Sequence, residues 1–164
     1  MVCPGSKWVN KQLKAETLIA FLKKIEGELK ASFLLVWGDA LEKELCEELN
    51  AHLKISHVVD KLPLAVWQNL MNEADLVIAV DSSALHLCGT TTTPSFSIFG
   101  PTAPKVFKPI GERHFAIQGK CPYGMVFEKQ CPLLRSCPTG ACIKEMTAEE
   151  LFQAFQNQRV FLQR

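Results

Sequence analysis

The chain has 164 residues, of which 48% are apolar and 21% are charged, and its formal net charge at pH 7 is +1. This length and composition are typical of one globular domain with a hydrophobic core. The near-balance of charge argues against a nucleic-acid partner. No apolar run reaches the roughly 18 residues of a membrane-spanning helix, and residues 1–5 do not follow the pattern of a secretory signal peptide. We therefore expect a single cytoplasmic domain over residues 1–164.

Predicted strands and helices alternate along the chain. Short apolar runs bounded by turn residues predict strands, at residues 2–3, 32–37, 55–59, 76–80, 95–99 and 114–117. Apolar residues at helical spacing predict helices, at residues 16–29, 42–53, 64–71, from 83 onward and at 147–157, where Thr147 and Glu150 form a capping box. Residues 119–143 are expected to form a long irregular loop. The alternation predicts an α/β fold, a Rossmann-like parallel sheet with helices on both faces.

One predicted strand ends in an acid and two hydroxyl residues. Residues 76–80 are continuously apolar, as in a parallel strand covered on both faces. Asp81, Ser82 and Ser83 follow it and open a helix that carries His86. Helix N-termini beyond such strands attract anions, so this junction predicts a site for a phosphorylated ligand. A purely structural role would suit the same residues, with Asp81 or Ser82 as the N-cap and His86 as a buried core histidine.

Other loops that follow predicted strands have a similar composition. They lie at residues 4–6, 38–39 and 99–102. Because the carboxyl ends of parallel strands meet at one edge of a sheet, we expect these loops and Lys11 to gather beside Asp81. Backbone donors, hydroxyls, a lysine and carboxylates together suit a nucleotide diphosphate. Neither G-x-x-x-x-G-K-[ST] nor G-x-G-x-x-G occurs, and ordinary βα turns would also be rich in Gly and Ser.

Several short segments follow, in order, the pattern of one known family. The pattern D-[ST]-G-x-x-H-L is similar to residues 81–87, and the pattern [FY]-G-P-T-x-P is similar to residues 99–104. The pattern P-G-[ST]-x-W-x-x-K is similar to residues 4–11. Two shorter patterns, G-x-x-x-E and P-[YF]-G, are similar to residues 37–42 and 109–111. These are motifs of glycosyltransferase family 9, the bacterial ADP-heptose:lipopolysaccharide heptosyltransferases. The late cysteines fit the Cys-rich insert of many members. The resemblance covers nearly the whole chain.

The resemblance implies the C-terminal, donor-binding half of a two-domain GT-B glycosyltransferase. Such an enzyme transfers a sugar, here heptose, from ADP-heptose to the lipopolysaccharide core, with inversion and without a metal or cofactor. A lysine would then stabilise the charge that builds on the departing ADP. The implied partners are the nucleotide sugar and a lipopolysaccharide core acceptor at the inner membrane face. The protein would be cytoplasmic and peripheral to that membrane.

The resemblance also implies a role for individual residues. The expected donor-binding residues are Ser6, Lys11, Glu42, Leu62, Asp81, Ser82, Ser83, His86 and Thr102. Among them, Lys11 and Thr102 would join the serines in contacting the diphosphate, and Asp81 and His86 would face the sugar and diphosphate. Glu42 would accept the ribose hydroxyls and Leu62 would lie near the adenine. Outside this resemblance, Lys11 would be an ordinary surface lysine and Glu42 an acid in the first turn of a helix.

The chain departs from the family in ways that bear on function. Ser83 stands where a glycine is usual, and four threonines at residues 90–93 replace an Ala-rich turn. Both changes affect the expected affinity for the donor or its identity. The family's N-terminal half carries the acceptor site and the carboxylate base, so no catalytic residue is assigned here. A second hypothesis is therefore a non-catalytic nucleotide-binding or interaction domain, either a degenerate remnant or a split half that works with a separate acceptor-binding chain.

Seven cysteines are present, and four of them are crowded together near the C-terminus. Their number is odd and no secretion signal was found, which indicates a reducing compartment. The crowded four are Cys121, Cys131, Cys137 and Cys142. Their spacing is not that of a common zinc motif. Free structural thiols, two disulfides, or a zinc or iron–sulfur site all fit the pattern. In each case we expect the loop to have a structural role, holding the segments around it together.

Overall fold

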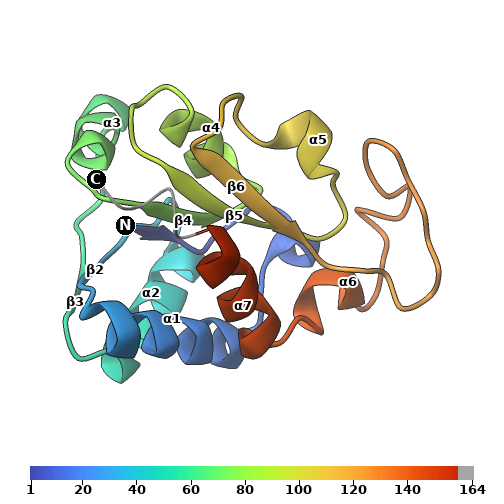
Figure 1. The fold of residues 1–164 in the computed structure, drawn as a ribbon, viewed down its shortest axis with the longest axis horizontal. Coiled ribbons are helices and arrows are strands. Elements are labelled where there is room, and N and C mark those ends of the chain that lie inside the picture. The colour runs from blue at the N-terminus through green and yellow to red at the C-terminus, as the bar shows by residue number, and fades with distance from the viewer. Residues whose placement is uncertain (159–164) are drawn as a thin grey trace.

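A computed structural model describes residues 1–158 of the chain, so residues 159–164 of the expected single domain lie outside the described part. Its centre is one sheet of six parallel strands in the order β3-β2-β1-β4-β5-β6 (Figure 1). The strands are β1 (Val2–Cys3), β2 (Phe33–Leu35), β3 (Ser56–Val58), β4 (Val77–Val80), β5 (Ser95–Phe99) and β6 (His114–Gln118). This arrangement confirms the expected α/β fold.

Helices cover both faces of the sheet (Figure 1). One face carries α1 (Ala15–Leu29), α2 (Ala40–His52) and α7 (Ala148–Gln158). The other carries α3 (Leu64–Asn72), α4 (Ser83–Cys88) and the one-turn α5 (Pro104–Phe107). None of the described helices is long and apolar enough to cross a bilayer.

The apolar run of β4 is explained by its two buried faces. Ile78 and Val80 belong to the core beneath α1, α2 and α7, whereas Val77 and Ala79 belong to the core beneath α3 and α4. Successive side chains of a strand point to opposite faces, so a strand buried on both sides has no polar positions. All four residues are at most 4% exposed.

Three aromatic rings join the last helix to the rest of the fold. The ring of Phe155 in α7 lies 5.5 Å from Phe96 in β5 and 6.1 Å from Phe21 in α1, both in edge-to-face geometry. At the start of α7, the Glu150 carboxylate accepts hydrogen bonds from the Thr147 backbone and hydroxyl, and the Thr147 hydroxyl accepts one from the Glu150 N–H. The expected capping box is therefore confirmed.

Three single-turn elements were not predicted. They are the 3-10 helix η1 (Val9–Lys11), α5 and α6 (Ala141–Lys144), the last of which lies at the end of the expected irregular loop. One turn is too short to show a helical period. Pro104 at the first position of α5 was the only local helix signal among them.

Candidate functional site

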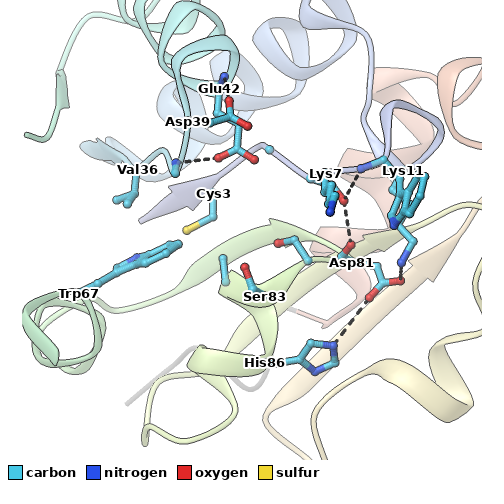
Figure 2. A pocket seen from close by; sticks show the side chains of 16 residues that line it. Cys3, Lys7, Lys11, Val36, Asp39, Glu42, Trp67, Asp81, Ser83 and His86 are labelled. Carbon is cyan, nitrogen blue, oxygen red and sulfur yellow. Dashed lines mark hydrogen bonds and ion pairs between the residues drawn. The ribbon is translucent and has the colours of Figure 1, made fainter. Parts of the chain in front are cut away.

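A cavity of about 670 Å³ lies at the carboxyl edge of the sheet and is lined by 16 residues (Figure 2). Gly5 to Lys7 follow β1 and Asp81 to Ala84 follow β4. These two strands are neighbours in the sheet, but the chain leaves them toward opposite sides, so the cavity is at the point where the strand order reverses. Ligands of open parallel sheets bind at this kind of crevice.

The Asp81 carboxylate is the centre of a polar cluster at one end of the cavity. Its Oδ2 atom lies 2.6 Å from the Lys11 Nζ and accepts a hydrogen bond of 2.6 Å from the Thr102 hydroxyl. Its Oδ1 atom lies 4.0 Å from the His86 Nε2. The Asp81 side chain is 4% exposed and that of Lys11 is 15% exposed. The carboxylate thus brings η1, α4 and the loop after β5 together in a partly dehydrated ion pair.

These contacts remove two of the structural alternatives. His86 is not a core residue, because 55% of its side chain is exposed at the rim of the cavity. Asp81 is not the N-cap of α4. Ser82 occupies that position, but its hydroxyl makes no capping hydrogen bond.

Glu42 closes a second corner of the cavity. Its Oε2 atom accepts a hydrogen bond of 2.7 Å from the Gly38 N–H, and its own N–H donates to the Asp39 side chain, which caps α2. A Cβ atom on Gly5 would overlap the Glu42 carboxylate, so a larger residue there would displace the Glu42 side chain from this corner of the cavity. Glu42 is thus an acid of the first helical turn and also a wall of the cavity.

Two polar atoms near the cavity have no partner. The Ser82 Oγ and the Trp67 Nε1 are both buried and make no hydrogen bond. A buried polar atom without a partner costs about 1–3 kcal/mol, so such atoms usually need an explanation. Both residues line the cavity, with Trp67 on the side opposite Lys11 (Figure 2).

Most of the predicted donor-binding residues lie together. Those that line the cavity are Ser6, Lys11, Glu42, Asp81, Ser82, Ser83 and His86. Thr102 is buried behind it and directs its hydroxyl at Asp81. Leu62, in the loop before α3, is half-buried and does not line the cavity.

Trp67, Cys3 and Val36 also line the cavity, although nothing at their places in the sequence predicts it. Trp67 sits on an apolar helix and the other two belong to strand segments, so each resembles ordinary core in the sequence. Burial raises the pKa of the Cys3 thiol to about 12, which makes it a poor nucleophile.

The four crowded cysteines line a second, nearly closed hollow of about 20 Å³. All seven cysteines are free thiols. Burial, reinforced by the three neighbouring thiols, raises the pKa of Cys142 to about 11. Hydrogen bonds from the Gly140 N–H and from Thr139 lower the pKa of Cys137. Within residues 1–158, no three Cys, His, Asp or Glu side chains are placed to hold a metal ion.

The fold and the crevice define a class: a Rossmann-like α/β domain with a ligand cleft where the strand order reverses. Comparison with known proteins gives the family. The profile of glycosyltransferase family 9 (heptosyltransferase) matches residues 1–136. The chain therefore belongs to glycosyltransferase family 9.

Individual relatives are longer than this chain. It is 30% identical to lipopolysaccharide heptosyltransferase 1 of Pseudomonas aeruginosa over 127 residues, which are 77% of this chain and 36% of that protein. The E. coli heptosyltransferase WaaC with ADP superposes with a TM-score of 0.78 at 18% identity, over 96% of this chain and 43% of WaaC. WaaC with ADP-2-deoxy-2-fluoro heptose gives 0.74 at 18% identity, over 95% and 42%. The chain thus spans less than half the length of these relatives.

Proposed function

We propose that this chain is the C-terminal, donor-binding half of a heptosyltransferase and that its cavity binds ADP-heptose or a similar nucleotide sugar. The observation that carries the proposal is the arrangement around Asp81, where a lysine, hydroxyls and a histidine meet at the point where the strand order reverses. The family assignment supports it. So do the relatives of the same fold that hold ADP and an ADP-heptose analogue.

In this proposal each part of the cavity meets one part of the donor. Lys11, Ser6 and the serines that open α4 receive the diphosphate, and Thr102 supports them from behind through Asp81. Glu42 accepts the ribose hydroxyls, His86 faces the sugar, and Leu62 approaches the adenine from the loop before α3. An acceptor hydroxyl would attack the anomeric carbon with inversion while ADP departs toward Lys11, whose positive charge stabilises the leaving group.

The acceptor would be the lipopolysaccharide core at the inner membrane face, bound by a separate domain or chain. The protein would then work in the cytoplasm, peripheral to that membrane. No metal or cofactor is assigned a role in the proposed transfer.

One observation favours the second candidate, a nucleotide-binding module without catalysis of its own. The three acids among the lining residues already have partners: Asp39 caps α2, Glu42 binds the Gly38 N–H and Asp81 pairs with Lys11. A general base must be within reach of the proton it abstracts and able to accept it. Among the other lining side chains His86 could still accept a proton, but the resemblance to the family assigns the base to the N-terminal half, so we expect the chain alone to bind donor without turnover.

Calorimetric titration of ADP, UDP and GDP against the chain tests the proposal. ADP should bind, and Lys11→Met and Asp81→Asn should each weaken it about tenfold or more, since a charged hydrogen bond contributes about 1.5–3 kcal/mol. Lys14→Met and Asp60→Asn are matched controls at exposed positions outside the cavity. No heat from ADP at millimolar concentration, with the fold intact by circular dichroism, would refute donor binding. Unchanged affinity in both pocket variants would place the site elsewhere.

A further inference from the structure

We propose that the cysteine-rich loop, residues 119–143, positions Lys11 in the donor cavity, and that Asn10 is the residue through which it acts. The loop lies outside the cavity, but it contacts both segments that supply partners to the Asp81 Oδ2 atom. The inference rests on the proposed function, because it assigns the loop a part in binding the donor diphosphate.

The first contact is with η1, the turn that ends in Lys11. The Asn10 side-chain amide donates two hydrogen bonds into the loop, to the Cys137 carbonyl at 2.9 Å and to the Leu134 carbonyl at 3.1 Å. The Arg135 guanidinium lies 4.9 Å from the centre of the Trp8 ring, just before η1. Together these contacts fasten the turn to the loop. Lys11, the residue after Asn10, extends to the Asp81 carboxylate in the cavity.

The second contact is with the segment that follows β5. The Cys131 N–H donates to the Pro101 carbonyl at 2.7 Å, and the Ala103 N–H donates to the Lys129 carbonyl at 2.8 Å. Thr102 between them pairs with Gln130 in an isolated antiparallel bridge. One loop therefore fastens the two segments that carry Lys11 and Thr102, and the side chains of these two residues converge on the same carboxylate oxygen.

The loop is shaped to fit Asn10. Gly140 adopts a left-handed φ of 59°, and a Cβ atom there would lie 2.8 Å from the Asn10 Oδ1. A glycine is thus needed twice over, for its backbone angle and for the space it leaves. Asparagine is also the short side chain that can give two N–H donors to two carbonyls, which aspartate of the same shape cannot.

Two measurements on the full chain test this role. The first is the ratio of the affinities for ADP and for adenosine, which isolates the contribution of the phosphates. The second needs no nucleotide: the rate at which a small active ester acetylates Lys11, read by mass spectrometry, with Lys14 as the internal reference.

We expect Asn10→Ala and the isosteric Asn10→Asp to lower the ADP affinity about five- to tenfold while leaving adenosine unchanged. Acetylation of Lys11 should become several-fold faster in both. In a Lys11→Met background, Asn10→Ala should have no further effect on ADP binding, because it acts through that lysine.

Gly140→Ala, which disturbs the contact from the loop side, should reproduce the changes expected for Asn10→Ala, namely the weaker ADP binding and the faster acetylation of Lys11. Asn72→Ala, which removes an asparagine contact to the turn before β5, should cause none of them.

Equal losses of ADP and adenosine affinity, or effects that add to those of Lys11→Met, would show a general structural role and overturn the inference. So would an unchanged affinity ratio together with an unchanged acetylation rate. If the wild-type chain does not bind ADP but Asn10→Ala still exposes Lys11 to acetylation, the proposed function fails while the positioning role stands.

Discussion

At the scale of single residues, Asp81 determines the character of the cavity. Its carboxylate pairs with Lys11 and accepts a hydrogen bond from the Thr102 hydroxyl, so it fixes both groups at the end of the cavity where the diphosphate is proposed to bind. An ion pair of this kind adds little to stability by itself, but removing one partner leaves the other charge uncompensated. Asp81 is therefore better explained as the group that holds Lys11 and Thr102 in place than as a source of stability.

The reactivity of the thiols gives a prediction at the same scale. Hydrogen bonds from Gly140 and Thr139 lower the pKa of the partly exposed Cys137, whereas burial raises the pKa of Cys46 to about 12 and of Cys88 to about 11. Since the thiolate is the nucleophile, iodoacetamide at pH 7.5 should label Cys137 well before those two. The labelling rate of Cys137 should rise with pH, and the midpoint of that rise should lie below the ordinary pKa of a thiol. Peptide mass spectrometry at timed intervals measures this, and earlier labelling of Cys46 or Cys88 would contradict it.

At the scale of elements, the pairing of β5 with β6 contains a buried histidine. The His114 Nδ1 atom lies 2.9 Å from the Ser95 hydroxyl, and the two residues are partners in the sheet register. Burial is the main cause that lowers the pKa of His114, and the nearby positive charges of Lys108 and Arg113 lower it further. The unfolded chain therefore takes up this proton first as the pH falls.

This predicts the sign of a pH dependence. The contribution of His114 to stability should be complete above its unfolded pKa of about 6.5 and should be lost as the pH falls from there toward the lower folded value. In His114→Gln, the free energy of unfolding in urea should decline less between pH 7 and pH 5 than in the wild type. His57→Gln, at an exposed position, serves as the control. Equal slopes in all three proteins would contradict the assignment.

The strands and long helices could be predicted because each carries its own period or apolar run, as in residues 76–80. Much of the cavity could be placed because the carboxyl ends of parallel strands share an edge, which brings Ser6, Glu42 and Asp81 together. The single-turn elements η1, α5 and α6 could not be predicted, because one turn is too short to show a period. Nothing in the sequence near Asn10 indicates that its partners are carbonyls more than 120 residues away.

At the scale of the whole molecule, the cavity and the two cores share the central strands. Residues that line the cavity follow β1 and β4 directly, so donor binding should stabilise the entire sheet rather than a local loop. At an ADP concentration 100 times the dissociation constant, the gain should be about 2.7 kcal/mol. Urea unfolding followed by far-ultraviolet circular dichroism, with and without ADP, measures it. Lys11→Met, which is expected to bind ADP at least tenfold more weakly, should gain at most about half as much, roughly 1.4 kcal/mol, at the same ADP concentration. A wild-type urea midpoint that does not move with ADP would show that the cavity is not part of the cooperative unit.

The position of β1 has a consequence for how the chain is made. Val2 pairs with Leu35 on one side and with Ile78 on the other, so this short central strand is translated before either neighbour. At roughly 5–20 residues per second, the interval between β1 and β4 leaving the ribosome is roughly 4 to 15 seconds. Until β4 emerges, the edge of β1 that pairs with it stays open. Completion of the sheet is therefore a late, non-local event, and the interval before it is when the nascent chain is most exposed to wrong partners.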